Sequence, residues 1–216
     1  MRWRSTSTVR SGKQSLKFLS TLSFPSPLTP PPTVAALGNV SDPRIPMPWF
    51  NIFNGGAQGN NDLHVDSVAF SIPSATTVSD ALMEASKIYQ NFSLGLDKLT
   101  PPPKAPNVGK TGGYSPQVEE MNDVLEAIKF TLIDAEMADK VNLSVNMNSG
   151  KYASQVESEE GDEEIAYQYD ITHYAPEDSV KVLKSSGEFI DDYFEMMAAH
   201  PIVSIEDGFD KKDSAR

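Results

Sequence analysis

The sequence predicts an α/β fold, because strand-like and helix-like segments alternate along the chain from residue 34 onward. Short apolar runs bounded by asparagine, glycine or proline are typical of strands, and longer segments with apolar residues three and four apart are typical of helices. Their order is strand, strand, helix, helix, strand, helix, strand. This order predicts a parallel sheet with crossover helices and a site at the carboxyl ends of its strands.

The composition of the 216-residue chain is that of a soluble protein, with 39% hydrophobic residues and enough length for one ordinary domain or two small ones. The sequence contains no apolar run of the roughly 18 residues that a transmembrane helix needs, so no membrane contact is expected. The chain has no cysteine, which excludes disulfides, thiolate catalysis and zinc–thiolate sites.

Residues 1–33 form a basic leader rich in serine and proline, with five Lys or Arg side chains and no acid. Such a leader is typical of an organellar transit peptide, and the alternative is a disordered extension ending in the linker FPSPLTPPPT. Because the whole chain carries −12 and the leader five positive charges, the remainder carries −17. This acidic excess argues against a nucleic-acid partner, since phosphate binding needs a basic face.

The first two strands are predicted within IPMPWFNIFNGG, residues 45–56, and HVDSVAFSIP, residues 64–73. A helix follows over residues 78–96, where Thr77 and Asp80 have the spacing of an N-terminal cap. The residues predicted to face the core from this helix are Val78, Leu82, Ala85, Tyr89, Phe92 and Leu96.

A second helix is predicted to begin with Ser115 as its cap and Pro116 at its first position. Its core stripe comprises Met121, Leu125, Ile128, Leu132 and Ala135. The next strand, residues 141–147, carries Asn146 at its carboxyl end, and the acidic stretch 157–164 is predicted to be a solvated loop. A third helix over 187–199, with Phe189, Ile190, Tyr193, Phe194 and Met197 facing inward, precedes the strand IVSIED.

The stretch NVGKTGGYSP, residues 107–116, contains a Gly-Lys-Thr sequence that invites comparison with a phosphate-binding loop. Such a loop needs a first glycine five positions before its Gly-Lys, and Lys104 stands at that place. It also follows a buried strand, whereas this stretch follows LTPPPKAP, whose prolines cannot donate ladder hydrogen bonds. A nucleotide-binding loop is therefore not predicted.

Four stretches, in order along residues 36–210, resemble the enolase family. IPMPWFNIFNGG resembles the family's L-P-V-P-x-F-N-V-I-N-G-G, and NVGKTGGYSP resembles N-V-G-D-E-G-G-F-A-P. VNLSVNMNSGKY is similar to the strand ending in G-M-D-V-A-A-S-E-F, and HPIVSIEDGFD resembles Y-P-(I/V)-V-S-I-E-D-P-F-D. On this resemblance the glycines of residues 109–113 shape an active-site loop.

The resemblance implies an eightfold α/β barrel that dehydrates 2-phosphoglycerate to phosphoenolpyruvate with Mg²⁺, usually as a cytoplasmic homodimer. Residues 34–216 would hold about the first half of this enolase-type TIM barrel, without the N-terminal capping domain. The expected ligands are 2-phosphoglycerate and phosphoenolpyruvate, and a second copy or another enolase chain is the expected protein partner. If residues 1–33 are a transit peptide, an organelle replaces the cytoplasm.

Two residues match the family's metal-binding positions. Glu206 matches a magnesium ligand, and its alternative role is that of a carboxylate hydrogen-bonded at a strand end. Asn146 stands where the family has a second aspartate, so any site here would bind the ion weakly, and its alternative role is to end a strand.

The family's acid and histidine positions are substituted. Thr111 stands where the family has the glutamate of D-E-G-G, with Lys110 before it, and threonine cannot act as a carboxylic acid. Gln58 stands where the family has a histidine. Near the family's Gln-Glu pair, either Asp66 or Ser67 takes the acidic position.

The three histidines carry no predicted role in the chemistry. His64 is interpreted as incidental, His173 lies in no family motif, and His200 is interpreted as a helix cap.

These substitutions leave two hypotheses for function. In the first, the chain is part of a phosphopyruvate hydratase whose remaining strands carry a third carboxylate, the lysine base and a phosphate-binding arginine. In the second, it is a non-catalytic enolase-like scaffold or interaction module. Half a barrel would also have open strand edges and an apolar interior, which would favour association.

Overall fold

A computed structural model describes residues 38–39, 41, 46–99, 107–118, 120–157 and 165–213. The chain divides into one unit spanning Met1–Pro46 and a second spanning Met47–Arg216, and the fold described below is that of the second unit. The expected leader, the boundary after residue 33 and residues 158–164 of the acidic stretch lie outside the described residues.

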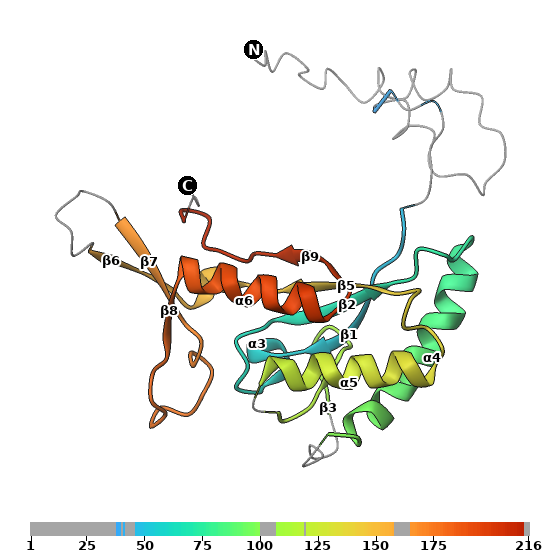
Figure 1. Cartoon of the computed structure of the whole chain (residues 1–216), viewed down its shortest axis with the longest axis horizontal. Coiled ribbons are helices and arrows are strands. Elements are labelled where there is room, and N and C mark those ends of the chain that lie inside the picture. Colours follow the sequence, from blue (N-terminus) through green and yellow to red (C-terminus); the bar gives the residue numbers. More distant parts are fainter. Residues whose placement is uncertain are drawn as a thin grey trace, which may run out of the picture. The chain divides into compact units, whose positions relative to one another are not determined.

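The main sheet contains the four strands that the sequence predicts and two short additional ones (Figure 1). In spatial order they are β3 (Asn107–Val108), β4 (Tyr114–Ser115), β1 (Phe50–Asn54), β2 (Ser67–Ser71), β5 (Asn142–Asn146) and β9 (Ile202–Glu206). The sheet is mixed, because β2 runs antiparallel to both β1 and β5, whereas β5 and β9 are parallel. The prediction of a parallel sheet was therefore wrong for β2.

The number of helices between strands explains these directions. The connection between β1 and β2 contains only the four-residue helix α3 (Gly56–Gly59), which is too short to act as a crossover helix. Strand β2 therefore returns beside β1 in the antiparallel direction, as in a hairpin. Two helices separate β2 from β5, and each reverses the chain, so β5 is antiparallel to β2. A single long helix before β9 restores the parallel direction. The edge of the sheet at which the sequence predicts the site therefore contains the carboxyl ends of β1, β5 and β9 and the amino end of β2.

The two faces of this sheet differ in chemistry. The face toward the helices is apolar, and its cross-strand neighbours are Phe53, Val68, Val145, Ile205, Phe70 and Leu143. The opposite face, the interior side of a barrel, has Ser67, Ala69, Asn142, Ser144, Asn146 and Ser204. The expected apolar interior was therefore wrong, because the side chains that alternate with the core residues are small or polar.

Helix α4 (Val78–Leu96) begins at the predicted cap, where the Thr77 side chain accepts a hydrogen bond from the Asp80 amide at 3.0 Å. Its buried residues are Ala81, Ala85, Ile88, Phe92, Gly95 and Leu96. Val78 and Leu82, which the stripe placed in the core, are 46% and 56% exposed. The helix is rotated relative to the prediction because its small residues Ala81, Ala85 and Gly95 lie on the packed side.

Helix α5 (Met121–Asp134) buries Met121, Leu125, Ile128 and Leu132 as the stripe predicts. Its predicted start was wrong, since Ser115 belongs to β4 and its hydroxyl donates to the Gly59 carbonyl. Pairing of this segment with the main sheet outweighed the local capping preference of serine and proline.

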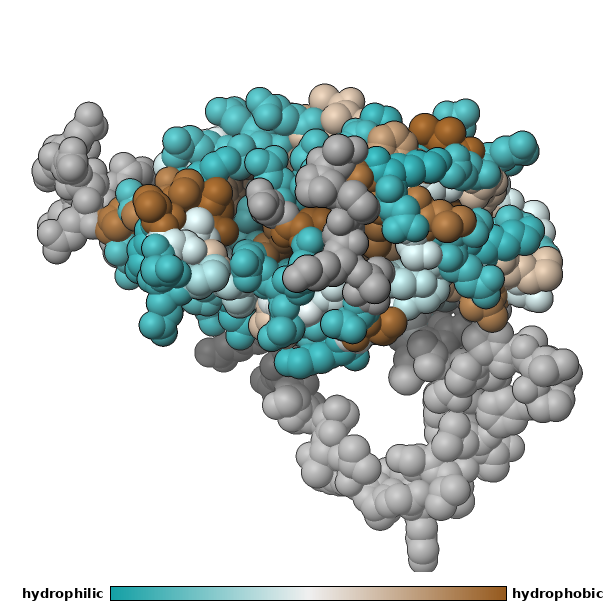
Figure 2. Space-filling model, turned by 90° about the horizontal axis from the view of Figure 1, so that it is seen from below, coloured by the Kyte–Doolittle hydropathy of each residue, from teal (hydrophilic) through white to brown (hydrophobic). Residues whose placement is uncertain are grey.

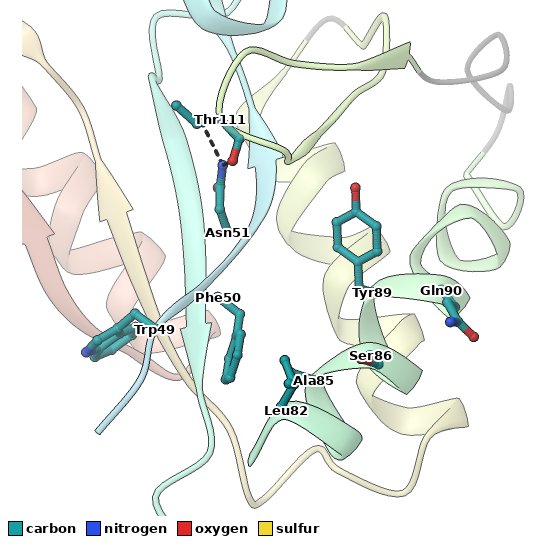
Figure 3. Close-up of a pocket in the computed structure, with 9 residues that line it drawn as sticks. All are labelled: Trp49, Phe50, Asn51, Leu82, Ala85, Ser86, Tyr89, Gln90 and Thr111. Atoms are coloured by element: carbon teal, nitrogen blue, oxygen red, sulfur yellow. Dashed lines mark hydrogen bonds between the residues drawn. The ribbon is translucent and has the colours of Figure 1, made fainter. Parts of the chain in front are cut away.

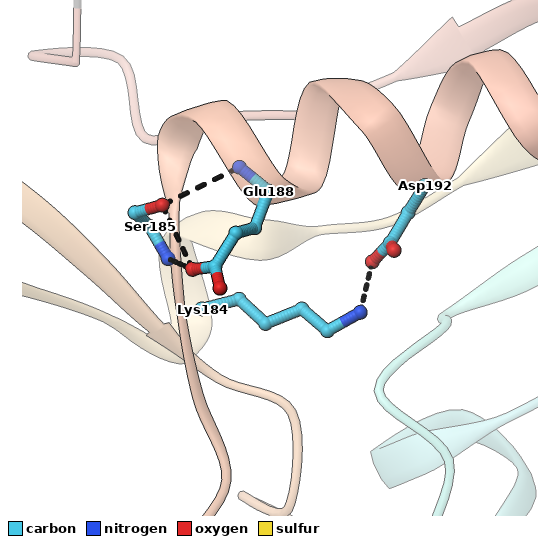
Figure 4. A network of polar contacts seen from close by, with 4 residues as sticks. All are labelled: Lys184, Ser185, Glu188 and Asp192. Carbon is cyan, nitrogen blue, oxygen red and sulfur yellow. Dashed lines mark hydrogen bonds and ion pairs between the residues drawn. The ribbon is translucent and has the colours of Figure 1, made fainter.

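Helix α6 (Ser186–Ala199) starts with a capping box in which the Ser185 and Glu188 side chains each bond the other's backbone amide (Figure 4). Phe189 and Tyr193 face the core as predicted. Phe194 and Met197 do not, because they lie on the outer side of the helix and are 67% and 46% exposed.

A second, smaller sheet of β6 (Ala153–Glu157), β7 (Ile165–Asp170) and β8 (Leu183–Ser185) was not predicted. These strands are short and partly polar, so their alternation is weak in the sequence. The one-turn 3₁₀ helix η1 (Ser149–Lys151) joins β5 to β6. The Tyr169 hydroxyl of β7 donates to Asp213 and its ring stacks on Phe189 at 4.8 Å, which ties this sheet to α6.

Hydrophilic residues cover most of the face shown in Figure 2, where hydrophobic residues gather in separate patches. No helix in the described part of the chain is long and apolar enough to cross a membrane.

Substitution of Gly95 by alanine is expected to destabilise the fold by about 2 kcal/mol, because overpacking forces neighbours apart. An added Cβ would lie 2.2 Å from the Thr131 hydroxyl and 2.3 Å from the Ala127 carbonyl oxygen, both on α5. Urea unfolding measures the change. Gly187→Ala is the matched control, since the nearest atom to its added Cβ lies 4.0 Å away and stability should hold or rise. Equal effects of the two substitutions would contradict close α4–α5 packing.

Candidate functional site

Backbone pairing brings four side chains of the predicted site region into one row. Asn54 pairs with Ser67, Ser67 with Asn146, and Asn146 with Glu206, at the ends of β1, β2, β5 and β9. Directly paired residues project from the same face of a sheet. The two predicted metal-site residues, Asn146 and Glu206, are therefore neighbours, as their positions at strand ends suggested.

Glu206 is exposed at the carboxyl end of β9, and its carbonyl accepts a hydrogen bond from the Met147 amide at 2.9 Å. Its carboxylate forms no ion pair with another described residue. The half-buried Asn146 side chain is already engaged, since its Oδ1 accepts from the Asn148 amide at 3.0 Å. The row thus offers one free carboxylate beside one amide that supports its own loop.

The sequence left open whether Asp66 or Ser67 takes the acidic position. Ser67 lies in the row opposite Asn146, whereas the Asp66 carboxylate accepts from Asn148 Nδ2 at 3.2 Å. Asp66 also lies near Tyr174, whose pKa is raised first by burial and then by this negative charge. The structure therefore places a hydroxyl in the row and directs the carboxylate to the adjacent loop.

The side chain of Asn54 holds the glycine-rich loop against β1. It is fully buried, its Oδ1 accepts from the Gly113 amide at 2.9 Å, and its Nδ2 donates to Thr111 Oγ1 at 2.7 Å. An added Cβ at Gly113 would lie 2.7 Å from the Phe53 backbone, so only glycine permits this approach. Gly112 has a φ of +88°, which also favours glycine.

Thr111 acts as a hydrogen-bond acceptor within this network. Its Oγ1 accepts from Asn54 Nδ2 and, at 2.9 Å, from Asn51 Nδ2, and the latter bond is drawn in Figure 3. The loop also reaches α3, because the Lys110 amide donates to the Gln58 carbonyl at 3.1 Å. The two substituted family positions, Gln58 and Thr111, therefore belong to one continuous set of contacts.

The surroundings of Thr111 supply no replacement acid. Thr111 borders an open cavity of about 510 Å³ between β1 and α4, and no Asp or Glu occurs among the described residues that line it (Figure 3). The Tyr89 hydroxyl in this cavity donates to the Gly112 carbonyl at 2.6 Å. Burial, and then the nearby Tyr114, raise the pKa of Tyr89, so this phenol holds its proton more tightly than usual.

The donor set does not fit a complete magnesium site. Mg²⁺ prefers several oxygen ligands in octahedral geometry, with carboxylates supplying the charge. In the described ranges, no three His, Asp or Glu side chains are placed to hold one ion. Glu206 and Asn146 could supply two oxygens, of which one is an amide already bonded to Asn148.

The histidines lie outside the row. His64 packs its ring against Tyr152 and Phe189, and burial followed by the charge of Lys184 lowers its pKa to about 4. His200 ends α6 through its backbone amide, which donates to the Met196 carbonyl at 3.0 Å. His200 is therefore the C-terminal cap of α6, as the sequence predicts. Its ring is buried, and neither ring nitrogen has a hydrogen-bond partner among the residues described.

Asn51 and Asn54 are the functional-site residues that sequence reasoning missed. Both occur in FNIFNGG, where the second asparagine was interpreted only as the end of a strand. Their partners, Thr111 and Gly113, lie more than 55 residues away, so only the tertiary structure shows the contact.

The family model described as "Enolase, C-terminal TIM barrel domain" matches residues 43–215. The chain belongs to the enolase family. A curated relative, the enolase of Mastigamoeba balamuthi, is 29% identical over 184 residues. This alignment covers 84% of the present chain and 40% of the relative, so the chain spans less than half the length of that enolase.

Family membership confirms the predicted fold class, a partial enolase-type TIM barrel. The strands of the main sheet fall within the matched range, and so do all four residues of the row.

Replacing Asn54 with alanine is expected to release the loop over residues 107–115 from β1, because the Gly113 amide loses its buried acceptor. We expect a loss of about 2 kcal/mol in urea unfolding, typical of a buried polar group left unpaired. Limited trypsin digestion should then cut faster after the exposed Lys110. Asn142→Ala is the control, since the Asn142 side chain bonds no other described residue. Unchanged cleavage after Lys110 would show that Asn54 does not hold the loop.

Proposed function

We propose that this enolase-family chain does not by itself dehydrate 2-phosphoglycerate, the substrate that the family resemblance implies, and that it serves as a non-catalytic enolase-like protein. The observation that carries the proposal is the setting of Thr111. It stands where the family has an acidic glutamate, and its hydroxyl oxygen is held by Asn51 and Asn54. No carboxylate borders its cavity among the described lining residues.

Loss of the acid matters because expulsion of hydroxide needs a proton donor at the leaving oxygen. A threonine hydroxyl is far too weak an acid at neutral pH, and Gln58, in the place of a histidine, does not titrate. General acid catalysis typically contributes about 10²–10⁴-fold to a rate, so these substitutions alone predict a large defect.

The magnesium that the family uses would also be held weakly. Asn146 removes one negative charge from the site that the resemblance implies, which leaves Glu206 as the carboxylate of the row. We therefore propose that substrate turnover and tight Mg²⁺ binding are both impaired in this chain.

A turnover assay with 2-phosphoglycerate and Mg²⁺, following phosphoenolpyruvate by its ultraviolet absorbance, is expected to show no activity above background. Glu206→Gln, purified in the same way, reports any enolase carried over from the expression host, because carried-over activity would be equal in both samples. Mg²⁺-dependent turnover that disappears in Glu206→Gln would contradict the proposal.

Restoring the lost charge tests the proposed metal weakness. Asn146→Asp is expected to raise the affinity for Mn²⁺, used as a paramagnetic substitute for Mg²⁺, by about tenfold, because a second carboxylate joins Glu206. Water-proton relaxation measures the binding. Asn142→Asp adds the same charge to the same face and strand, four residues away, and should change affinity little. Equal gains from both variants would mean that net charge, not the row, attracts the ion.

A further inference from the structure

A groove of about 810 Å³ separates the N-terminal end of α5 from α6, and neither the row nor the glycine-rich loop lines it. Its walls come from the β1–β2 connection, the first turn of α5, the middle of α6 and the segment after β7. This volume lies in the range of ligand-binding clefts.

The floor of the groove is apolar and rich in methionine. Leu63, Met121, Met147, Phe189 and Tyr193 line it, and each is at most 8% exposed. The half-buried Met196 extends this surface along α6. Methionine side chains are flexible and polarizable, so such a floor adapts to apolar partners of different shape.

The rim of the groove is acidic. Asp62, Glu120 and Glu195 are exposed at its edges, and none forms an ion pair with another residue in the described part of the chain. The cation in the wall, Lys184, is already paired with Asp192 at 2.5 Å (Figure 4).

The imidazole in the wall adds no positive charge at neutral pH. Burial, and then the charge of Lys184, lower the pKa of His64 to about 4. The ring is therefore uncharged at neutral pH. The groove therefore combines an apolar floor with three carboxylates whose charges are not balanced locally.

We propose that this groove docks a basic amphipathic segment of a partner protein, with apolar side chains on the methionine floor and Lys or Arg side chains at the acidic rim. Charge complementarity favours a basic segment as the partner. An acidic segment would be repelled by the rim, and a purely apolar segment would leave the rim carboxylates unpaired. Long basic side chains suit this geometry, since their methylene stems cover apolar surface while their charged ends reach the rim. An amphipathic helix laid in an apolar groove is a common mode of peptide recognition.

Fluorescence anisotropy with the full chain and a labelled 14-residue peptide of lysine and leucine, patterned as an amphipathic helix, tests the proposal. Two further peptides replace leucine with serine or lysine with glutamate. We expect the lysine–leucine peptide to bind at least about tenfold more tightly than either, because both floor and rim contribute. Binding should weaken as salt rises, since exposed charges are screened. If the lysine–serine peptide bound as tightly as the lysine–leucine peptide, positive charge alone would account for binding, and the proposal would be overturned. Absence of binding by the lysine–leucine peptide would also overturn it.

A triple variant separates the rim from the general acidity of the chain. Asp62→Asn, Glu120→Gln and Glu195→Gln together are expected to weaken the lysine–leucine peptide about tenfold, since each exposed ion pair contributes modestly. The matched control removes three exposed carboxylates that do not line the groove, through Asp97→Asn, Glu136→Gln and Asp139→Asn. Equal losses in the two triple variants would assign the binding to net charge and reject the groove.

The absence of cysteine from the chain allows a direct test of location. Asn122→Cys introduces a thiol at the groove, and Asp139→Cys introduces one outside it. After labelling with benzophenone maleimide, illumination should crosslink the lysine–leucine peptide at residue 122 and not at residue 139. The reverse pattern, or equal capture at both positions, would place the bound peptide elsewhere.

Discussion

The register that joins β1, β2, β5 and β9 is the constraint on which both the core and the candidate site depend. Because side chains alternate across a strand, the same pairing that stacks Phe53, Val68 and Val145 against the helices aligns Asn54, Ser67, Asn146 and Glu206 at the strand ends. A shift of one residue in the pairing register of β2 or β5 would move apolar residues to the barrel side of the sheet. The four residues of the row would then no longer lie side by side. Burial of the apolar face therefore fixes the geometry of the polar one.

The row and the glycine-rich loop both lie within the range that matches the enolase barrel model, and uncharged groups make most of their contacts. Asn54 connects strand and loop through two hydrogen bonds, of which the one from the Gly113 amide is buried. These groups give a well-packed structure but do not titrate near neutral pH. Hydrogen bonding thus holds the loop in place, and the proposed loss of activity rests on Gln58 and Thr111, which supply no carboxylic acid or imidazole.

The unbalanced acidity of the second unit is not spread evenly. Near Thr111 the described lining is neutral, whereas the groove between α5 and α6 has three free carboxylates above an apolar floor. The two proposals therefore concern different parts of the molecule, the surroundings of Thr111 and the groove between α5 and α6.

The sequence by itself determined the family, the four barrel strands, the three long helices and the cap at Thr77, because these depend on local patterns and on long motifs. It did not determine the direction of β2, since strand polarity depends on how many helices reverse the chain. It misplaced Leu82, Phe194 and Ser115, whose environments are set by packing between distant segments. Only the tertiary structure revealed Asn54 as the link to Thr111 and Gly113, because hydrogen bonds across more than 55 residues leave no local signature.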